Sequence, residues 1–189
     1  MNHFNFEKHL EKLASQIYSE PPSSQHTNAS KELIEEFCRD LSFQNVVELG
    51  CGTAPCLDIL KSWGKETFGV TAKGEIVNHS VYRGDMHFTG LADQSYDLVI
   101  ARHALEHSPM PLILLMEGRR ITRKYALVVV PVPDRRMIEY PNHYSVFPKD
   151  NWEHLFKLSN WKILKFKQAD YCGEPDYTYQ EYRYLLEGI

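Results

Sequence analysis

The chain has 189 residues, of which 43% are hydrophobic and 24% are charged, so it suits one domain with its own core and is not a disordered chain. Its net charge of -4 gives no overall field that would attract a phosphate backbone, which argues against nucleic-acid binding. The apolar runs are too short to span a membrane, and the amino terminus is unlike a secretory signal, so a cytoplasmic protein is expected. The four cysteines lack the spacing of a zinc site, so reduced thiols and no metal are expected.

Two amphipathic helices are expected before residue 45. Apolar residues recur at helical spacing from Phe6 to Ile17, and this first helix should end before the linker-like stretch Glu20–Ser24. The second helix is expected to start from an N-cap at Ser30. Its buried face is expected to comprise Leu33, Ile34, Phe37 and Leu41.

From residue 45 onwards, short apolar strands alternate with helices. Several of the strands are almost entirely apolar, as parallel strands covered on both faces are. Helices are expected to begin at Pro55 and at Pro111, with Gly64 just after the end of the first. This alternation predicts a doubly wound α/β sheet. The expected strands are Asn45–Leu49, Thr67–Val70, Val81–Arg83, Tyr96–Ala101 and Tyr125–Val130.

The carboxyl-terminal part has a different pattern. A helix is expected to begin near Asp150, and a strand should follow over Trp161–Phe166. The aromatic stretch Tyr177–Tyr184 is also typical of a strand, although its alternation slips near Glu181. Together these segments predict a closing antiparallel hairpin.

The strongest local feature is a strand that runs into two glycines, Gly50 and Gly52, before a helix. Glycine permits unusual dihedral angles and the close approach of a ligand to the backbone, so the layout serves several nucleotide cofactors. Pro55 replaces the third glycine of a dinucleotide motif and cannot donate the backbone N–H that a pyrophosphate needs. Glu48 would repel a pyrophosphate but suits a ligand with an ammonium and a sulfonium group.

These residues carry a resemblance to a known family. Glu48–Gly52 resembles the first motif of class I S-adenosylmethionine-dependent methyltransferases, and three later segments are similar in order and spacing to the later motifs of its type 11 branch. Those segments are Arg83–Met86, Leu91–Ile100 and Ala101–His107. The match covers about residues 45–135 and is weaker through the tail. It implies a Rossmann-like methyltransferase fold, with a mostly parallel seven-stranded sheet whose last strand is antiparallel.

The resemblance also implies where S-adenosylmethionine would bind, with S-adenosylhomocysteine as the product. The glycine loop would line the methionine part, Asp85 and Met86 would contact adenine, and the segment from Ala101 to His103 would form the floor of the reaction site. The cofactor-binding residues implied in this way are Glu48, Gly50, Cys51, Gly52, Thr71, Asp85, Met86, Ala101 and Arg102. The pair Glu106–His107 resembles a recurrent pair that opens the next helix and is more often structural than catalytic.

Two positions depart from the family pattern. Ala54 replaces a third glycine, a small change that should be tolerated. Thr71 replaces the acidic residue that holds the ribose hydroxyls, and a neutral partner makes a weaker hydrogen bond than a carboxylate. Thr71 therefore also supports an alternative interpretation, a non-catalytic member of the family that acts as a binding or partner subunit.

Two histidines are candidate catalytic residues. Methyl transfer from a sulfonium is an in-line displacement, so positioning and desolvation supply much of the catalysis. His103 is the best candidate for a general base, because its matched position faces the transferable methyl group. His143 lies in a long loop after the fifth strand that would close over the substrate. A structural or surface role is the alternative for each of them.

The acceptor can be narrowed by what the sequence lacks. The segment after the fourth strand contains neither the Asp/Asn-Pro-Pro-aromatic sequence nor the Pro-Cys nucleophile of nucleobase methyltransferases, and no carboxylate set suits a metal-dependent catechol-type mechanism. A small-molecule, lipid or nucleotide-derived acceptor remains. A nicotinamide-dependent oxidoreductase is a second alternative, against which Pro55 and Thr71 argue.

We therefore expect one methyltransferase domain over residues 1–189. Residues 1–44 would form amino-terminal helices, residues 45–135 the cofactor-binding core, and residues 136–189 the substrate-side loop and the closing strands.

Overall fold

The computed structural model describes residues 8, 24–72, 80–174 and 177–189. Within these residues the strands are β1 (Asn45–Leu49), β2 (Glu66–Thr71), β3 (Ser80–Arg83), β4 (Tyr96–Arg102), β5 (Thr122–Pro131), β6 (Trp161–Glu174) and β7 (Tyr177–Gly188). The α-helices are α2 (Ser24–Cys38), α3 (Pro55–Ser62), α4 (Pro111–Ile121), α5 (Arg135–Glu139) and α6 (Lys149–Leu158), and a 3-10 turn, η1, spans Leu105–His107.

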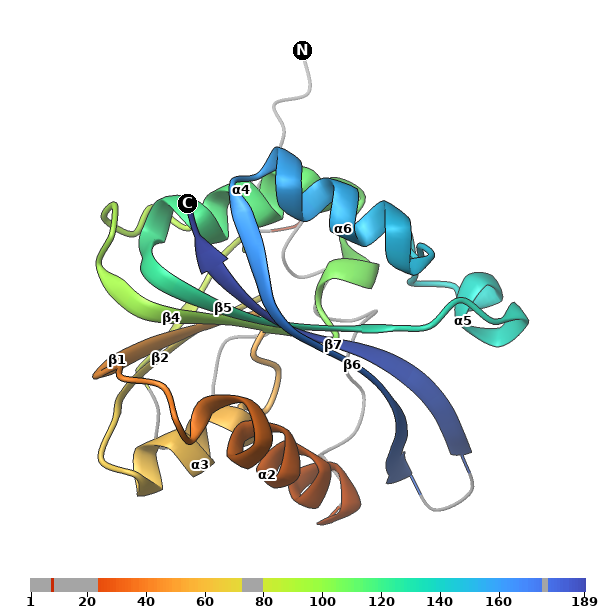
Figure 1. Cartoon of the computed structure of the whole chain (residues 1–189), viewed down its shortest axis with the longest axis horizontal. Coiled ribbons are helices and arrows are strands. Elements are labelled where there is room, and N and C mark those ends of the chain that lie inside the picture. Colours follow the sequence, from red (N-terminus) through yellow and green to blue (C-terminus); the bar gives the residue numbers. More distant parts are fainter. Residues whose placement is uncertain (1–7, 9–23, 73–79, 175–176) are drawn as a thin grey trace.

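All seven strands belong to one sheet, in the order β3-β2-β1-β4-β5-β7-β6 (Figure 1). The pairs from β3 to β5 are parallel, whereas β7 runs antiparallel to both of its neighbours, β5 and β6. The predicted fold class, a doubly wound mostly parallel seven-stranded sheet with an antiparallel last strand, is confirmed.

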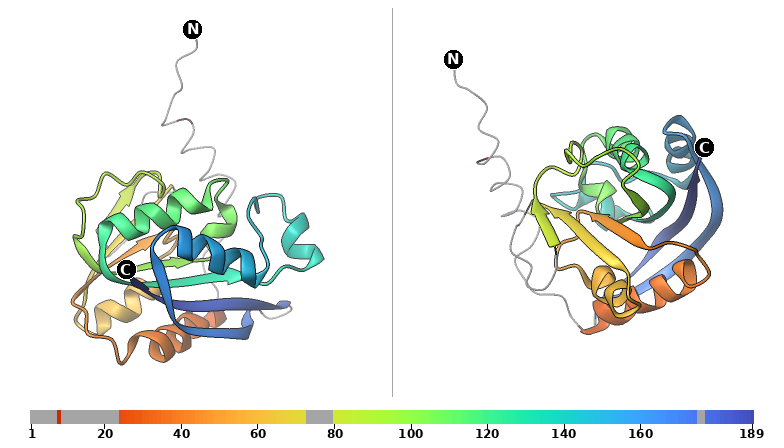
Figure 2. Two further views of the ribbon diagram at one scale, coloured as in Figure 1. Left: turned by 45° about the horizontal axis from the view of Figure 1, so that its top comes forward. Right: turned by 90° about the vertical axis from the view of Figure 1, so that its left-hand side faces the viewer.

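Helices cover both faces of the twisted sheet (Figure 1; Figure 2). On one face, α2 and α3 pack over a core that includes Leu33, Ile34 and Leu57. On the other face, α4 and α6 pack over a core that includes Trp152 and Phe156, both fully buried. Because the central strands are covered on both sides, their side chains are apolar in both directions, and for this reason the sequence pattern located them well. No helix among the described residues is both long and apolar enough to cross a membrane.

Most of the expected elements are confirmed, with longer bounds at the carboxyl end. Pro55 and Pro111 begin α3 and α4, and Gly64 follows α3 with a φ of 75°. The alternation slips near Glu181 because residues 181–186 of β7 are buried in succession on both faces of the sheet. Tyr182, Tyr184 and Leu186 belong to the core on one face, and Leu185 belongs to the core on the other. Two short elements, α5 and η1, were not expected from the sequence.

The predicted N-cap at Ser30 is wrong. The helix α2 already begins at Ser24, so Ser30 lies inside it, and the Ser30 hydroxyl accepts a hydrogen bond from buried Arg102 instead. The helix expected between Phe6 and Ile17 lies outside the described residues.

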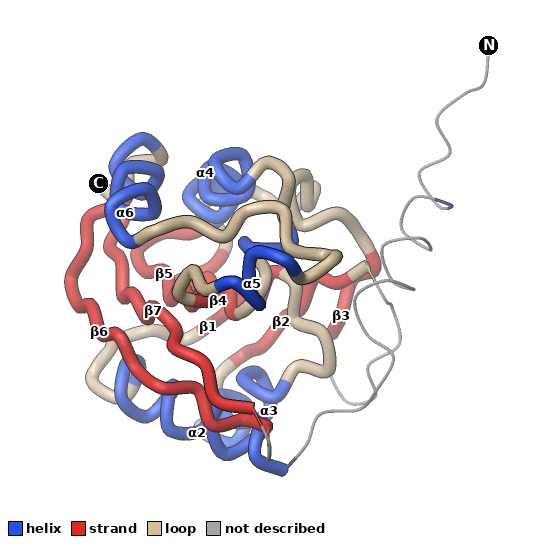
Figure 3. Tube along the Cα trace, turned by 90° about the vertical axis from the view of Figure 1, so that its right-hand side faces the viewer, coloured by secondary structure: helices blue, strands red, loops and turns tan. Residues whose placement is uncertain are grey.

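The loops that could form a site gather at the carboxyl ends of the parallel strands. Figure 3 faces this end of the sheet and shows α5 in front of β4 and β5. In open α/β sheets, ligands bind in the crevice at this edge. The glycine loop after β1 and the segment after β4 both lie there.

Candidate active site

The loop between β1 and α3 is held against the neighbouring strands by its glycines. Gly50 has a φ of 73° and Gly52 a φ of 51°, and the backbone N–H of Gly50 donates to the carbonyl of Val70 at 2.8 Å. A Cβ atom at Gly50 would lie 2.8 Å from the Cβ of Ala104, so the two loops approach more closely than another residue would permit. Ala54, in the place of a third glycine, also adopts the left-handed conformation, with a φ of 61°.

A pocket opens at this loop and extends to the end of β4. Its empty space is about 350 Å³, part of it open to solvent. The lining residues are Glu48, Gly50, Cys51, Gly52, Thr53, Pro55, Arg102 and His103. The structure therefore brings together most of the site residues chosen from the sequence. Five of them, Thr71, Asp85, Met86, Ala101 and His143, do not line this pocket.

Glu48 is a buried carboxyl group at the base of the pocket. It is 3% exposed, and among the described residues no donor contacts its Oε2 atom. Burial raises the pKa of Glu48 to about 8, although the charge of Arg102 and a hydrogen bond from Cys56 act in the opposite direction. An added cationic ligand would therefore favour the ionised carboxylate.

Arg102 extends from β4 into the same buried region. Its guanidinium donates to the Ser30 hydroxyl at 2.6 Å and lies over the ring of Tyr171, 5.8 Å from the centroid. These contacts join α2, β4 and β6 behind the pocket. Arg102 therefore forms part of the pocket wall and also balances the charge of the nearby carboxylates.

These features fit the methionine end of S-adenosylmethionine. The buried Oε2 atom of Glu48 is an acceptor of the kind that an ammonium group requires, and Gly50 and Gly52 line the same pocket. The residues expected at the adenosine end are arranged differently. Thr71 is 4% exposed, and the Asp85 carboxylate accepts hydrogen bonds from the backbone N–H and the Nδ1–H of His87, at 2.8 and 2.6 Å.

His103 sits at the mouth of the pocket in a constrained conformation. Its φ of 48° is unusual for a residue with a side chain. Its Nδ1 lies 3.0 Å from Glu106 and its Nε2 lies 2.8 Å from Glu181, with the Tyr179 hydroxyl 3.3 Å from the same nitrogen. The ring also packs edge-on against Tyr171.

The two carboxylates keep His103 protonated at neutral pH. Burial alone lowers the pKa of His103, but hydrogen bonds and charge from Glu106 and Glu181 outweigh it and raise the pKa to about 9. A general base needs a free lone pair to accept a proton. In this arrangement His103 has none, so the geometry favours a positioning role over the expected role as a base.

His143 lies beyond His103, in the loop between α5 and α6. Its Nδ1–H donates to the Met137 carbonyl at 2.8 Å, and its ring stands 4.9 Å from that of His107. Burial lowers the pKa of His143, so its imidazole is neutral near pH 7. One atom from each of Glu106, His107 and His143 lies within 4.8 Å of the others. Sequence reasoning missed this convergence, because His143 is 36 positions away from His107 and no spacing rule connects them.

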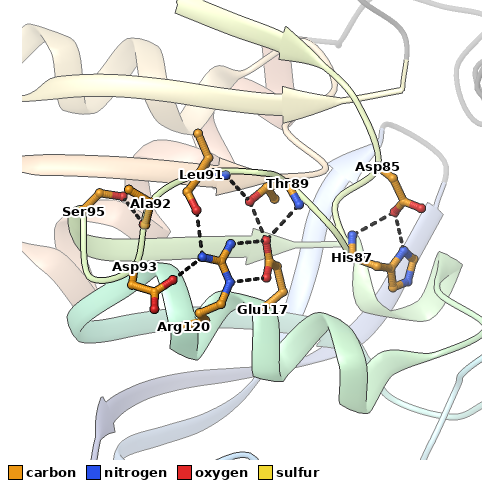
Figure 4. A network of polar contacts seen from close by, with 9 residues as sticks. All are labelled: Asp85, His87, Thr89, Leu91, Ala92, Asp93, Ser95, Glu117 and Arg120. Atoms are coloured by element: carbon orange, nitrogen blue, oxygen red, sulfur yellow. Dashed lines mark hydrogen bonds and ion pairs between the residues drawn. The ribbon is translucent and has the colours of Figure 1, made fainter.

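A second polar network lies away from the pocket, between α4 and the loop before β4 (Figure 4). The buried carboxylate of Glu117 accepts hydrogen bonds from the backbone and hydroxyl of Thr89 and from Arg120. Arg120 also contacts Asp93 and the Leu91 carbonyl. Its groups satisfy one another, so this network fixes the loop and is no candidate for a site.

A family model matches most of the chain. Residues 23–165 match a family model described as a methyltransferase domain. Among curated protein sequences, the chain has no significant match.

Three similar solved structures cover almost the whole chain. The magnesium protoporphyrin IX methyltransferase of Synechocystis PCC 6803, solved with bound S-adenosylmethionine, is 11% identical, with a TM-score of 0.69 and coverage of 100% of both chains. A possible histamine N-methyltransferase of Thermotoga maritima is 16% identical, with a TM-score of 0.67 and coverage of 97% of this chain and 98% of its own. A chain in the complex between the Haloferax volcanii Trm112 methyltransferase activator and a putative methyltransferase is 14% identical, with a TM-score of 0.71 and coverage of 96% and 93%. At these identities the likeness shows the fold.

Proposed function

The chain belongs to the methyltransferase domain family and is an S-adenosylmethionine-dependent methyltransferase, and from this premise we propose that its acceptor is a small-molecule, lipid or nucleotide-derived compound. The observation that carries the proposal is the pocket after β1, where a buried carboxylate oxygen without a partner among the described residues adjoins a glycine loop and the clamped His103. When bound, the donor supplies a methyl group on a sulfonium sulfur.

The donor side of the pocket binds and orients. We propose that Glu48 accepts hydrogen bonds from the ammonium group, which would hold this carboxyl in its ionised form. The loop through Gly50 and Gly52 lines the pocket with backbone atoms, because neither residue has a side chain. Arg102 closes the rear of the pocket and helps to exclude water. Thr71, Asp85, Met86 and Ala101 remain proposed donor contacts at the adenosine end and the floor.

The proposed acceptor side is aromatic. His103, Tyr171 and Tyr179 form one packed group, in which the ring centroids of the tyrosines lie 5.5 and 5.8 Å from that of the histidine. Such a wall suits a compact acceptor better than a folded protein or a duplex. We propose that His103 positions the acceptor through its ion pairs to Glu106 and Glu181, which fix the ring between η1 and β7.

The division of residues 1–189 into amino-terminal helices (1–44), cofactor-binding core (45–135) and substrate-side segment (136–189) belongs to the same proposal. The His143 loop and β7 support it, because His143 lies beside Glu106 and Glu181 contacts His103. A cytoplasmic location is likewise proposed, because the buried cysteines Cys38, Cys51 and Cys56 are free thiols.

Donor binding tests the first part of the proposal. Isothermal titration with S-adenosylmethionine and S-adenosylhomocysteine should show one site in the native chain. The Glu48→Gln variant should bind about ten-fold to a hundred-fold more weakly, since a charged hydrogen bond contributes roughly 1.5–3 kcal/mol. Glu139→Gln is the matched control, because Glu139 is 62% exposed in its side chain and pairs only with Arg135 among the described residues. If the native chain binds neither compound at millimolar concentration, the assignment of the pocket is wrong.

Turnover tests the second part. The chain is incubated with methyl-labelled donor and a cell extract separated into small-molecule, lipid, protein and nucleic-acid fractions. Label should appear in the small-molecule or lipid fraction and be lost with Glu48→Gln. Label confined to protein or polymeric nucleic acid would overturn the acceptor proposal. Donor binding without label in any fraction would instead support the non-catalytic alternative.

A further inference from the structure

Three side chains of the metal-binding type converge beside the candidate active site. Glu106 and His107 come from η1, and His143 comes from the loop that follows α5. One potential ligand atom from each residue lies within 4.8 Å of the others. None of the three lines the pocket at Glu48, so this group is separate from the proposed donor site.

Both imidazoles are fixed in the tautomer that leaves Nε2 as an acceptor. The Nδ1–H of His107 donates to the Asn142 carbonyl at 2.9 Å, and the Nδ1–H of His143 donates to the Met137 carbonyl at 2.8 Å. Because a carbonyl oxygen only accepts, each Nδ1 carries a proton, and the tautomer that can bind a metal has its lone pair on Nε2. Metal-bound histidines show this arrangement, in which a backbone carbonyl orients the ring through the opposite nitrogen.

The carboxylate supplies an independent observation. Glu106 is 1% exposed, and its Oε1 accepts a hydrogen bond from His103. Among the residues that the structure describes, no donor contacts its Oε2, which is buried. A buried carboxylate oxygen without a partner is costly, and a bound cation would remove that cost.

The backbone holds the His143 loop against η1. The backbone N–H groups of Tyr144 and Ser145 donate to the Glu106 carbonyl at 2.7 and 3.1 Å, and the Ser145 hydroxyl donates to the Ser108 carbonyl at 2.6 Å. Ser145 is buried. The residue next to His143 is therefore anchored directly to the Glu106 backbone, so the convergence of the three side chains is built into the fold.

We propose that Glu106, His107 and His143 bind a divalent transition-metal ion such as Zn²⁺ or Mn²⁺. Two imidazoles and one carboxylate favour such ions over Mg²⁺ or Ca²⁺, which take mainly oxygen ligands. With bonds of about 2.1 Å, ligand atoms in a tetrahedral site stand about 3.4 Å apart, so the three side chains close inward by roughly 1 Å on binding.

Three protein ligands leave a coordination position open. This step rests on the proposed function: the open position on the metal would take an oxygen or nitrogen atom of the methyl acceptor. The two sites are adjacent, because Glu106 also holds His103 at the mouth of the donor pocket. The substrate class is then an acceptor with a metal-binding group, such as a hydroxyl beside a carbonyl or carboxylate.

Metal titration of the chelator-treated chain tests the site without donor or acceptor. Isothermal titration with ZnCl₂ and with MnCl₂ should show one ion per chain, and Co²⁺ should give the visible absorption of a nitrogen- and oxygen-ligated ion. His143→Ala and His107→Ala should each weaken Zn²⁺ binding at least about a hundred-fold. His154→Ala is the matched control, because His154 is exposed on α6 and outside the group, and it should bind like the native chain.

Four outcomes would overturn the proposal: no binding of either ion at millimolar concentration, an unchanged affinity in His143→Ala, an equal loss in His154→Ala, or a thiolate charge-transfer band with Co²⁺. Unfolding of metal-free His143→Ala should match that of the metal-free native chain, which shows that lost binding is not lost folding. Titration of His143→Ala with S-adenosylmethionine should give the native affinity. A chain that binds metal but no donor keeps this inference and refutes the assignment of the donor pocket.

Discussion

Replacing Gly50 with alanine should destabilise the chain far more than the same change at a glycine with free space around it. Gly50 has a φ of 73°, and its added Cβ would lie 2.8 Å from the Cβ of Ala104. Gly64 has a φ of 75°, and nothing described lies within 4 Å of its added Cβ. The two positions therefore share the backbone strain, and only Gly50 adds a collision between the glycine loop and the segment after β4.

The magnitudes separate these two effects. A side chain in the left-handed conformation costs about 1–2 kcal/mol, and overpacking adds about 1–3 kcal/mol. Gly64→Ala should thus lower the free energy of unfolding by about 1–2 kcal/mol, and Gly50→Ala by about 2–5 kcal/mol. For a chain of this size, each kcal/mol lowers the melting temperature by roughly 2–4 °C.

Urea unfolding of both variants measures the difference directly, with Gly90→Ala as a second control. Gly90 has a φ of 70° and also has nothing within 4 Å of an added Cβ. Donor affinity should fall only in Gly50→Ala, since this substitution displaces the loop that lines the pocket. If all three variants lose the same stability, the close approach of the loops at Ala104 does not restrict residue 50 and the reasoning is refuted.

Three further predictions concern buried polar groups. Because the pKa of Glu48 in the folded chain is about 8, above its ordinary value of 4.5, its protonation stabilises the native state fully below pH 4.5, and this stability is lost as the pH rises through 8. Urea unfolding across this pH range should show the decline in the native chain and not in Glu48→Gln. An equal decline in the two proteins would contradict the prediction. Glu117→Ala removes the acceptor of four hydrogen bonds and should lower the free energy of unfolding by about 2–4 kcal/mol. The same change at exposed Glu139 should lower it by less than about 0.5 kcal/mol. Equal losses of stability in urea unfolding would contradict this prediction. Ser30→Ala removes a buried acceptor of Arg102 and should cost about 1–3 kcal/mol by the same assay, where a change within error would show that this hydrogen bond contributes nothing.

The elements that sequence could predict are those whose cause is local. The strand Asn45–Leu49 was found with its observed bounds, since a short apolar run between turn residues has few other uses. Pro55 and Gly64 marked the two ends of α3 because each favours one backbone conformation. The number of strands and the antiparallel direction of the last one were implied by the family resemblance rather than by these local signals.

What the sequence could not give depends on contacts between distant residues. The sequence predicts Ser30 as a helix N-cap, but its hydroxyl accepts a hydrogen bond from Arg102, 72 positions away. From the sequence, His103 is a candidate for a free general base. Only in the folded chain does Glu181, which is 78 positions away, contact its Nε2. A histidine's protonation depends on its neighbours, so its chemical role could not be inferred before the fold was known.

The position of β7 in the sheet has a consequence for how the chain is made. During synthesis from the amino terminus, β6 emerges before β7, yet the sheet places β7 between β5 and β6. Until β7 has been made, the edge of β5 and the whole of β6 lack their hydrogen-bonding neighbour and present open strand edges. The strand β7, which joins β6 to the rest of the sheet, is therefore synthesised after both of its neighbours. A chaperone that shields strand edges would be needed most before β7 has left the ribosome.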